Sequence, residues 1–226
     1  MKAVVLSSGG LDSTTCLAMA VKKLGAENVS ALSIFYGQRH ERELQSAKAV
    51  AKFYNVAHYE LDAAEIFKNS DSALLNTSTE PLEKSSYAAQ IQNNESPRIA
   101  TYVPFRNGLM ISIAASFADG LYDDSVEIYI GVHSDDAGEA YADCRADFIA
   151  SMSAAVRIGT YEKIHLVAPF LCQKKSDVVK VGLELNAPYH LTWSCYERGE
   201  KPCGKCATCI DRAKAFELNG VKDPAL

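Results

Sequence analysis

The sequence predicts an α/β fold: a doubly wound, mostly parallel sheet with helices on both of its faces. Short β-branched apolar runs alternate with longer stretches of helical spacing, and this order is typical of parallel sheets covered by helices. A glycine-rich loop joins the first apolar run to the first helical stretch. The length of 226 residues, with 48% apolar and 23% charged residues, suits one globular domain that carries a small appendage.

The first half of the chain supplies three predicted strands and two predicted helices. Residues 3–6 (Ala-Val-Val-Leu) are a short β-branched run, as expected of a buried parallel strand. A helix follows from residue 11, because apolar side chains recur there at helical spacing until Gly25, which is placed as a C-terminal cap. We then expect a strand over 29–35, a charged helix over about 40–54 and a strand over 56–61.

Helices and strands alternate again in the second half. We expect helices over 105–121, 143–158 and 175–185, and strands over 127–132 and 164–168. Between the two halves, residues 62–103 are rich in Ser, Asn and Thr. A segment of that length is either a functional lid or partly disordered.

The loop Ser8-Gly9-Gly10-Leu11-Asp12-Ser13 is the strongest functional signal. Two glycines allow positive φ and close backbone approach, so that N–H groups at the start of a helix point at one anion. The loop has no lysine of the Walker type. An aspartate beside phosphate requires a cation, so Asp12 is interpreted as a Mg²⁺ ligand or as a residue that orients one. The alternative is a serine and glycine turn that caps an ordinary helix.

Four cysteines near the end of the chain form a second signal. Overlapping Cys-x-x-Cys units bring thiolates to one point, and four thiolates complete a tetrahedral structural Zn²⁺ site. Disulfides are disfavoured in a cytosolic chain, whereas an iron–sulfur cluster takes the same ligands. Cys16 and Cys172 are expected to be small core residues. The metal ligands predicted are Cys195, Cys203, Cys206 and Cys209.

The phosphate loop resembles the Ser-Gly-Gly-x-Asp-Ser signature of the ATP pyrophosphatase (PP-loop) superfamily. Further segments follow it in order: Phe35-Tyr36-Gly37-Gln38, Tyr102-Val103-Pro104-Phe105-Arg106-Asn107, Asp143-Cys144-Arg145 and Thr192-Trp193-Ser194-Cys195-Tyr196. Together they are similar to the 7-cyano-7-deazaguanine synthase family, from the first strand to Asp223-Pro224. One departure is Ala142, where the family usually has proline, and the loss leaves that turn less pre-organised.

The resemblance implies an activity. Members of the family convert 7-carboxy-7-deazaguanine and ammonia to the nitrile, through an adenylated carboxylate and an amide. It also implies a PP-loop ATP-binding domain of the adenine nucleotide alpha hydrolase kind over residues 1–192, with a four-cysteine zinc module over residues 193–226. ATP, Mg²⁺ and Zn²⁺ would be the cofactors. A homodimer in the cytoplasm is the expected assembly.

The resemblance also assigns roles to residues. Lys175 would stabilise charge on the transferring phosphates, unless it is a solvated surface lysine. Arg106 would pair with a phosphate or with the substrate carboxylate, unless it is an ordinary surface arginine. Asp143 and Arg145 would contact the substrate. The residues that would hold ATP and its metal are Ser8, Gly9, Gly10, Leu11, Asp12 and Ser13.

The net charge and the hydropathy of the chain disfavour binding to nucleic acid and insertion into a membrane. The net charge of −5 disfavours wholesale binding of nucleic acid. We expect no membrane span, because no stretch approaches the ~20 apolar residues that one requires, and no signal peptide. Two rival functions remain open. A PP-loop enzyme that thiolates tRNA would need a broad basic surface, and a zinc-ribbon regulator that binds DNA would leave the phosphate loop without a role.

Overall fold

The computed structural model describes residues 1–39, 41–93, 98–137, 141–197 and 199–225, and a parallel sheet lies at its centre. Among these residues the sheet has five strands in the order β3-β2-β1-β4-β5. Every neighbouring pair is parallel. The predicted doubly wound sheet is confirmed. Its strands are β1 (Lys2–Leu6), β2 (Val29–Phe35), β3 (Ala57–Asp62), β4 (Val126–Tyr129) and β5 (Ile164–Val167).

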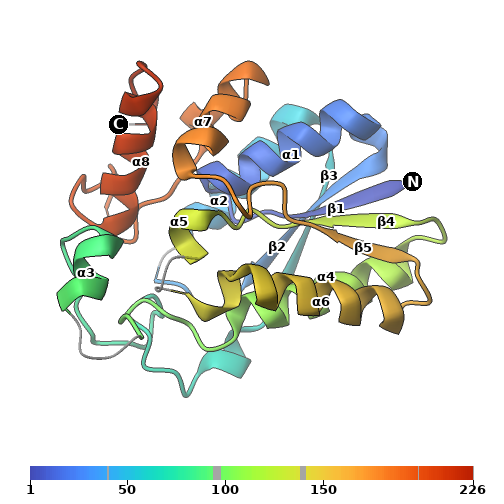
Figure 1. Ribbon diagram of the computed structural model, residues 1–226, viewed down its shortest axis with the longest axis horizontal. Coiled ribbons are helices and arrows are strands. Elements are labelled where there is room, and N and C mark those ends of the chain that lie inside the picture. Colours follow the sequence, from blue (N-terminus) through green and yellow to red (C-terminus); the bar gives the residue numbers. More distant parts are fainter. Residues whose placement is uncertain (40, 94–97, 138–140, 198, 226) are drawn as a thin grey trace.

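Helices cover both faces of this sheet, as predicted. Consecutive side chains of a strand point to opposite faces, so Val4 joins the cluster under α4 and α6 whereas Val5 joins the cluster under α1 and α7. Figure 1 shows α1 and α7 over one face and α4 and α6 over the other. The helices are α1 (Leu11–Leu24), α2 (Arg42–Tyr54), α3 (Tyr87–Asn93), α4 (Arg106–Leu121), α5 (Ser134–Ala137), α6 (Ala146–Gly159), α7 (Lys175–Glu184) and α8 (Ala207–Leu218).

The order of the strands determines where a ligand can bind. From β1 the chain builds outward through β2 and β3, and it then returns to the other side of β1 to add β4 and β5. The loops after β1 and β4 therefore diverge and leave a crevice at the carboxyl ends of these strands. In Figure 1, α3, α5 and the start of α8 gather at this same edge.

Two predicted helices begin two or three residues later than expected. Asp143 and Cys144 belong to a 3₁₀ turn, and α6 begins only at Ala146, after Arg145 in an extended conformation. The Asp143 carboxylate instead accepts a hydrogen bond of 2.9 Å from the backbone N–H of Asn107, in the first turn of α4. Helix α2 begins at Arg42, and residue 40, the expected start, lies outside the described residues.

The described part of the 62–103 segment packs over the end of β2. Phe67, Leu74, Leu75 and Leu82 form a small apolar cluster with Tyr36. This packing places the segment at the carboxyl edge of the sheet, as the lid interpretation requires.

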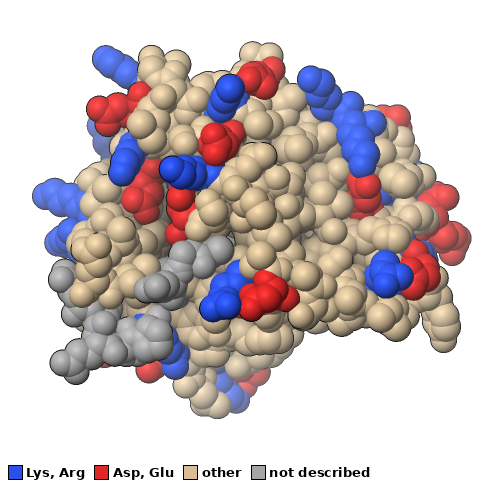
Figure 2. Space-filling model, in the orientation of Figure 1, with Lys and Arg blue, Asp and Glu red and all other residues tan. Residues whose placement is uncertain are grey.

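Charged side chains of both signs are interspersed on the face shown in Figure 2. Ion pairs at or near the surface of the described chain include Arg145 with Asp147 and Lys163 with Asp119, each at 3.0 Å. Exposed pairs contribute about 0–1 kcal/mol each. Among the residues described, none of the helices combines the length and the apolar character that a membrane span requires.

Helix α8, which the sequence pattern does not predict, carries the buried Arg212, which joins it both to the C-terminal tail and to the chain before the cysteines. The Arg212 guanidinium donates to both oxygens of Asp223, at 2.6 and 2.9 Å, and both side chains are less than 5% exposed. Arg212 also donates to Thr192 Oγ1 at 2.8 Å and to the carbonyl of Tyr189 at 3.3 Å. Phe216 of the same helix joins the apolar cluster of α1 and α7.

Removal of the carboxylate should be strongly destabilising, because it leaves a buried guanidinium without its counter-charge. We predict that Asp223→Ala lowers the free energy of unfolding by about 3–5 kcal/mol, as measured by urea denaturation. The exposed neighbour Lys222 serves as the control, and Lys222→Ala should change stability by no more than about 0.5 kcal/mol. Similar small values for both variants would contradict the structural role given to the pair.

Candidate active site

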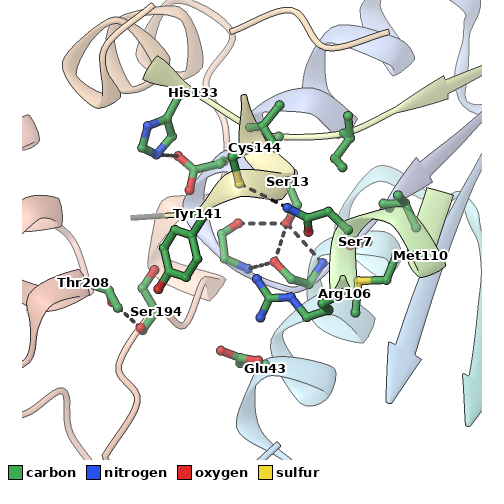
Figure 3. A pocket seen from close by; sticks show the side chains of 18 of the residues that line it. Ser7, Ser13, Glu43, Arg106, Met110, His133, Tyr141, Cys144, Ser194 and Thr208 are labelled. Atoms are coloured by element: carbon green, nitrogen blue, oxygen red, sulfur yellow. Dashed lines mark hydrogen bonds and ion pairs between the residues drawn. The ribbon is translucent and has the colours of Figure 1, made fainter. Parts of the chain in front are cut away.

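A cavity of about 230 Å³ opens at the carboxyl edge of the sheet. Its walls come from the loops after β1 and β4, the end of β2, the starts of α2, α4 and α7, and the chain before α8. Figure 3 shows that side chains from these separate elements converge on one space. The crevice predicted by the strand order is therefore a real cavity, and it contains the phosphate loop.

The loop between β1 and α1 is shaped to hold an anion. Gly9 has φ +79°, and a Cβ atom there would lie 2.1 Å from the carbonyl oxygen of Glu43, so glycine is required. The hydroxyls of Ser8 and Ser13 lie 3.1 Å apart, and the Ser8 N–H donates to Ser13 Oγ at 3.2 Å. Backbone N–H groups and two hydroxyls thus converge at the N-terminus of a helix. The Leu11 side chain is buried in the core, so only its backbone can take part.

Asp12 and Lys175 meet beside this loop. The Lys175 ammonium donates to Asp12 Oδ2 at 3.0 Å, and its side chain is only 14% exposed, so it is not a solvated surface lysine. Burial alone would raise the pKa of Asp12, but the positive charge of Lys175 overcomes this and holds the pKa below its ordinary value. Asp12 Oδ1 is buried and has no hydrogen-bond donor among the described residues. A buried anionic oxygen of this kind fits a Mg²⁺ ion.

The position of Lys175 is set by the start of α7 and by a histidine. The backbone N–H of Lys174 donates to Asp177 at 2.9 Å, which closes the first turn, and that of Lys175 donates to Asp135 at 2.8 Å. His133 Nε2 lies 3.2 Å from the Lys175 ammonium nitrogen. His133 is not among the site residues that the sequence predicts. The one feature of the local sequence that could have indicated a role in the site is the position of His133 shortly after a predicted strand.

Arg106 lies on the other side of the phosphate loop. Its guanidinium donates to the Tyr36 hydroxyl at 3.3 Å and lies over the ring of the same tyrosine. Figure 3 shows the Arg106 side chain between the loop serines and Glu43. Tyr87 and Tyr196 also line the cavity, and a 2.8 Å hydrogen bond joins their hydroxyls. Arg106 is therefore a cavity residue and not an ordinary surface arginine.

Glu43 adds a carboxylate that the sequence does not single out. It belongs to the first turn of α2 and lines the cavity. No hydrogen bond or ion pair joins its carboxylate to another of the described residues. Burial raises the pKa of Glu43 to about 7, although the nearby Arg106 charge opposes the rise. The sequence places it in a charged helix, where a solvated glutamate is the ordinary expectation.

The two residues predicted to contact the substrate do not line the cavity. Asp143 is 4% exposed and binds the first turn of α4, which carries Arg106, so it acts on the site through the position of that helix. The Arg145 side chain is 62% exposed and pairs with Asp147 at 3.0 Å. The structure thus brings together Asp12, Lys175 and Arg106 but leaves Arg145 outside, and a substrate contact by Arg145 stays a prediction.

The four cysteines before and in α8 converge as predicted. Their sulfur atoms all lie within 4.8 Å of one another, and a tetrahedral zinc site with Zn–S bonds of about 2.3 Å would place sulfurs roughly 3.8 Å apart. Gly204, with φ +68°, makes the turn between Cys203 and Cys206. Backbone N–H groups donate to the sulfurs of Cys195 and Cys203 at 3.3 Å. This donor set fits Zn²⁺.

Cys16 and Cys172, which lie outside the cluster, differ in burial. Cys16 is buried, as expected of a core residue, whereas Cys172 is exposed. The prediction that Cys172 is a core residue was therefore wrong. It lies in a turn between β5 and α7, where the chain runs over the surface.

Comparisons with known proteins agree with the sequence resemblance. The family model described as "Queuosine biosynthesis protein QueC" matches residues 2–220. Proteins named 7-cyano-7-deazaguanine synthase from Archaeoglobus fulgidus and Thermoplasma volcanium are 40% and 43% identical to this chain, over 100% and 99% of it and over 90% and 89% of their own lengths. A solved structure titled NH3-dependent NAD synthetase, from Campylobacter jejuni, is also similar, with a TM-score of 0.49, 16% identity, and coverage of 97% of this chain and 75% of that one.

A phosphate loop at the switch point of a parallel sheet, with an aspartate in place of the Walker lysine, defines the class of ATP-dependent PP-loop enzymes. Within that class, the match over residues 2–220 and the identity of about 40% over the whole chain determine the family. The chain belongs to the QueC family of queuosine biosynthesis proteins. The family predicted from the ordered motifs is confirmed.

The raised pKa of Glu43 predicts a pH-dependent stability. The folded chain keeps this carboxyl protonated up to about pH 7, whereas the unfolded chain releases the proton near the ordinary pKa of 4.5. The carboxyl therefore destabilises the fold increasingly as the pH rises through this window, and removal of the charge should prevent that loss.

We predict that Glu43→Gln has a higher free energy of unfolding than the wild type at pH 8, by on the order of 1–3 kcal/mol. The difference should vanish toward pH 4.5. Urea denaturation at several pH values measures it, with the exposed Glu41→Gln of the same helix turn as the control. A difference that stays constant with pH would contradict the assigned burial of the charge.

Proposed function

We propose that this chain catalyses the ATP-dependent conversion of 7-carboxy-7-deazaguanine and ammonia to 7-cyano-7-deazaguanine. The observation that carries the proposal is the meeting of Asp12 and Lys175 beside the phosphate loop, in a chain whose relatives are named for this synthesis. A carboxylate resists attack by ammonia until one of its oxygens becomes a leaving group. Transfer of an adenylyl group from ATP supplies that leaving group.

The proposed roles follow from the positions of the residues. Ser8, Gly9, Gly10 and Ser13, with the backbone of Leu11, hold the pyrophosphate portion of ATP. Asp12 would hold Mg²⁺, which would neutralise charge on the phosphate oxygens. Lys175 stabilises the negative charge that develops on the transferring phosphate.

Arg106 is proposed to pair with the substrate carboxylate or with a phosphate through two parallel hydrogen bonds. Asp143 supports it by holding the start of α4.

Two adenylation steps account for the product. A carboxylate oxygen of the acid attacks the α-phosphorus of ATP, and pyrophosphate leaves. Ammonia then displaces AMP and loses a proton, which yields the amide. The amide oxygen attacks the α-phosphorus of a second ATP and releases a second pyrophosphate, and loss of AMP together with the two remaining nitrogen protons forms the C≡N bond. One site can serve both steps, because both oxygens are bound to the same carbon.

The cysteine cluster and the assembly complete the proposal. We infer one structural zinc ion held by Cys195, Cys203, Cys206 and Cys209, in a module over residues 193–226 that packs on the ATP-binding domain over residues 1–192. The mutual distances of the four sulfurs support the zinc site. The family resemblance supports a homodimer in the cytoplasm. The comparisons favour neither the thiolation of tRNA nor a DNA-binding regulator.

Turnover of ATP tests the proposed activity. With ATP, Mg²⁺, ammonium and 7-carboxy-7-deazaguanine, we expect AMP, pyrophosphate and the nitrile, as detected by mass spectrometry, and no AMP without the acid. Asp12→Ala should lower kcat by about 10²–10³-fold, because it removes a charge that acts on the transferring group. The exposed Asp119→Ala should retain full activity.

ATP turnover that is indifferent to the acid, or a stable phosphorylated product, would refute the reaction. Synthetic amide given with ATP and no ammonium should yield the nitrile. An unconverted amide, in a preparation that converts the acid, would refute the two-stage mechanism.

Metal analysis tests the zinc site. We predict one zinc per chain, and that Cys206→Ser loses the zinc together with thermal stability, since a structural site of this kind can contribute on the order of 10 kcal/mol to the folding of its module. The exposed cysteine outside the cluster supplies a matched control, and Cys172→Ser should keep both zinc and stability. Iron in place of zinc, or a metal-free chain of full stability, would overturn the assignment.

A further inference from the structure

Glu43 differs from the other charged residues that the proposed reaction uses. Asp12 is paired with Lys175, and Arg106 donates to Tyr36. The Glu43 carboxylate reaches the same cavity without a hydrogen-bond or ion-pair partner among the described residues. The side chain is half-buried, so its carboxylate loses part of its contact with water and gains no hydrogen bond from the described residues in return, which destabilises the charged form. Groups of this kind are explained when a ligand supplies the missing donors.

The surroundings of Glu43 suit a flat, polar heterocycle. Arg106 lies between the phosphate loop and Glu43 in Figure 3. Along the cavity wall from the loop, the donors of Arg106 are therefore followed by the two acceptor oxygens of Glu43. Tyr36 and Trp193 line the same cavity. The Arg42 guanidinium lies 4.7 Å from the centre of the Trp193 ring and helps to hold that ring in place. Aromatic side chains can pack against the faces of a planar ring.

The substrate of the proposed reaction offers the complementary edge. Its 2-aminopyrimidinone ring presents a carbonyl oxygen, a ring N–H and an amino group in a row. An acceptor and two donors on the ligand match the donor of Arg106 and the two acceptors of Glu43. The carbonyl carbon and the carbon that carries the 7-carboxylate are bonded to the same ring-fusion carbon, so the two groups lie side by side and Arg106 can serve both.

We propose that Glu43 determines the specificity for the substrate ring, with its two carboxylate oxygens accepting hydrogen bonds from the ring N–H and the 2-amino group. The inference rests on the proposed function and extends it to the recognition of the base. The ligand's N–H groups stabilise the charge that burial otherwise opposes. Recognition by hydrogen bonds in a buried site discriminates strongly, because an analogue that lacks a donor leaves the protein acceptor unpaired.

A substitution that keeps the shape of the side chain provides the first test. Glu43→Gln presents an NH₂ group to a ligand donor, so we expect KM for 7-carboxy-7-deazaguanine to rise at least 100-fold while KM for ammonium stays unchanged. Glu41→Gln, an exposed change in the same part of the chain, should match the wild type. The variant is expected to be at least as stable as the wild type at pH 8, so weaker binding cannot be attributed to unfolding. A rise in KM for ammonium alone would show that Glu43 binds ammonium, and would overturn the proposal.

An analogue of the substrate supplies the second test. The corresponding 7-carboxy compound without the 2-amino group should be at least 100-fold poorer in kcat/KM for the wild type. For Glu43→Ala the ratio should fall below about tenfold, because the two losses remove the same interaction and are not additive. An undiminished ratio, in a preparation whose wild type converts the acid, would overturn the role of Glu43 alone. A wild type that does not convert the acid would refute the proposed function itself.

Discussion

The close approach at Gly9 is the constraint on which the rest of the site depends. The chain must leave β1 at Leu6 and enter α1 at Leu11, and it does so with Gly9 at φ +79° directly against the carbonyl oxygen of Glu43. The Gly9 carbonyl also accepts a hydrogen bond of 2.9 Å from the backbone N–H of Trp193. One residue without a side chain thus joins the phosphate loop, α2 and the segment that leads to the cysteines. The same contact that shapes the anion site also brings Glu43 and Trp193 to the cavity.

Charged side chains that are removed from water in this chain are of two kinds, those with a partner of opposite charge in direct contact and those without one. Arg212 and Asp223 form a two-bond pair that holds α8, and Asp12 and Lys175 form a pair that holds the start of α7 beside the loop. In each pair the opposite charge compensates for the loss of contact with water. Glu43 has only the partial compensation of the nearby Arg106 charge, without an ion pair or a hydrogen bond to the described residues, and its pKa rises. The fold therefore tolerates one destabilised carboxylate at the place where the ligand is proposed to bind, which is a common relation between stability and function.

The cysteine cluster influences the cavity through its neighbours in the chain. Cys195 lies between Ser194 and Tyr196, and both of these residues line the cavity. Arg212 donates to Ser194 Oγ at 3.1 Å, so the ion pair that holds α8 also steadies this wall. Four sulfurs would close the coordination shell of a zinc ion. Such an ion can shape the site without any direct part in the chemistry.

The sequence by itself determined the features whose residues are close neighbours in the chain. The alternation of apolar runs predicts the parallel sheet, the six-residue loop predicts the anion site, and the spacing of the cysteines predicts the cluster, because each pattern reports geometry within a few turns of chain. Only the tertiary structure decided which distant groups meet. It pairs Asp12 with Lys175, 163 positions apart, places His133 beside them, directs Arg145 to solvent and leaves Glu43 half-buried in the cavity wall. The local sequence around a glutamate in the cavity wall can be the same as that around a solvated one. The difference arises from how separate helices and strands pack around the side chain. The physical environment of a charge is therefore a property of the folded chain, and no local pattern encodes it.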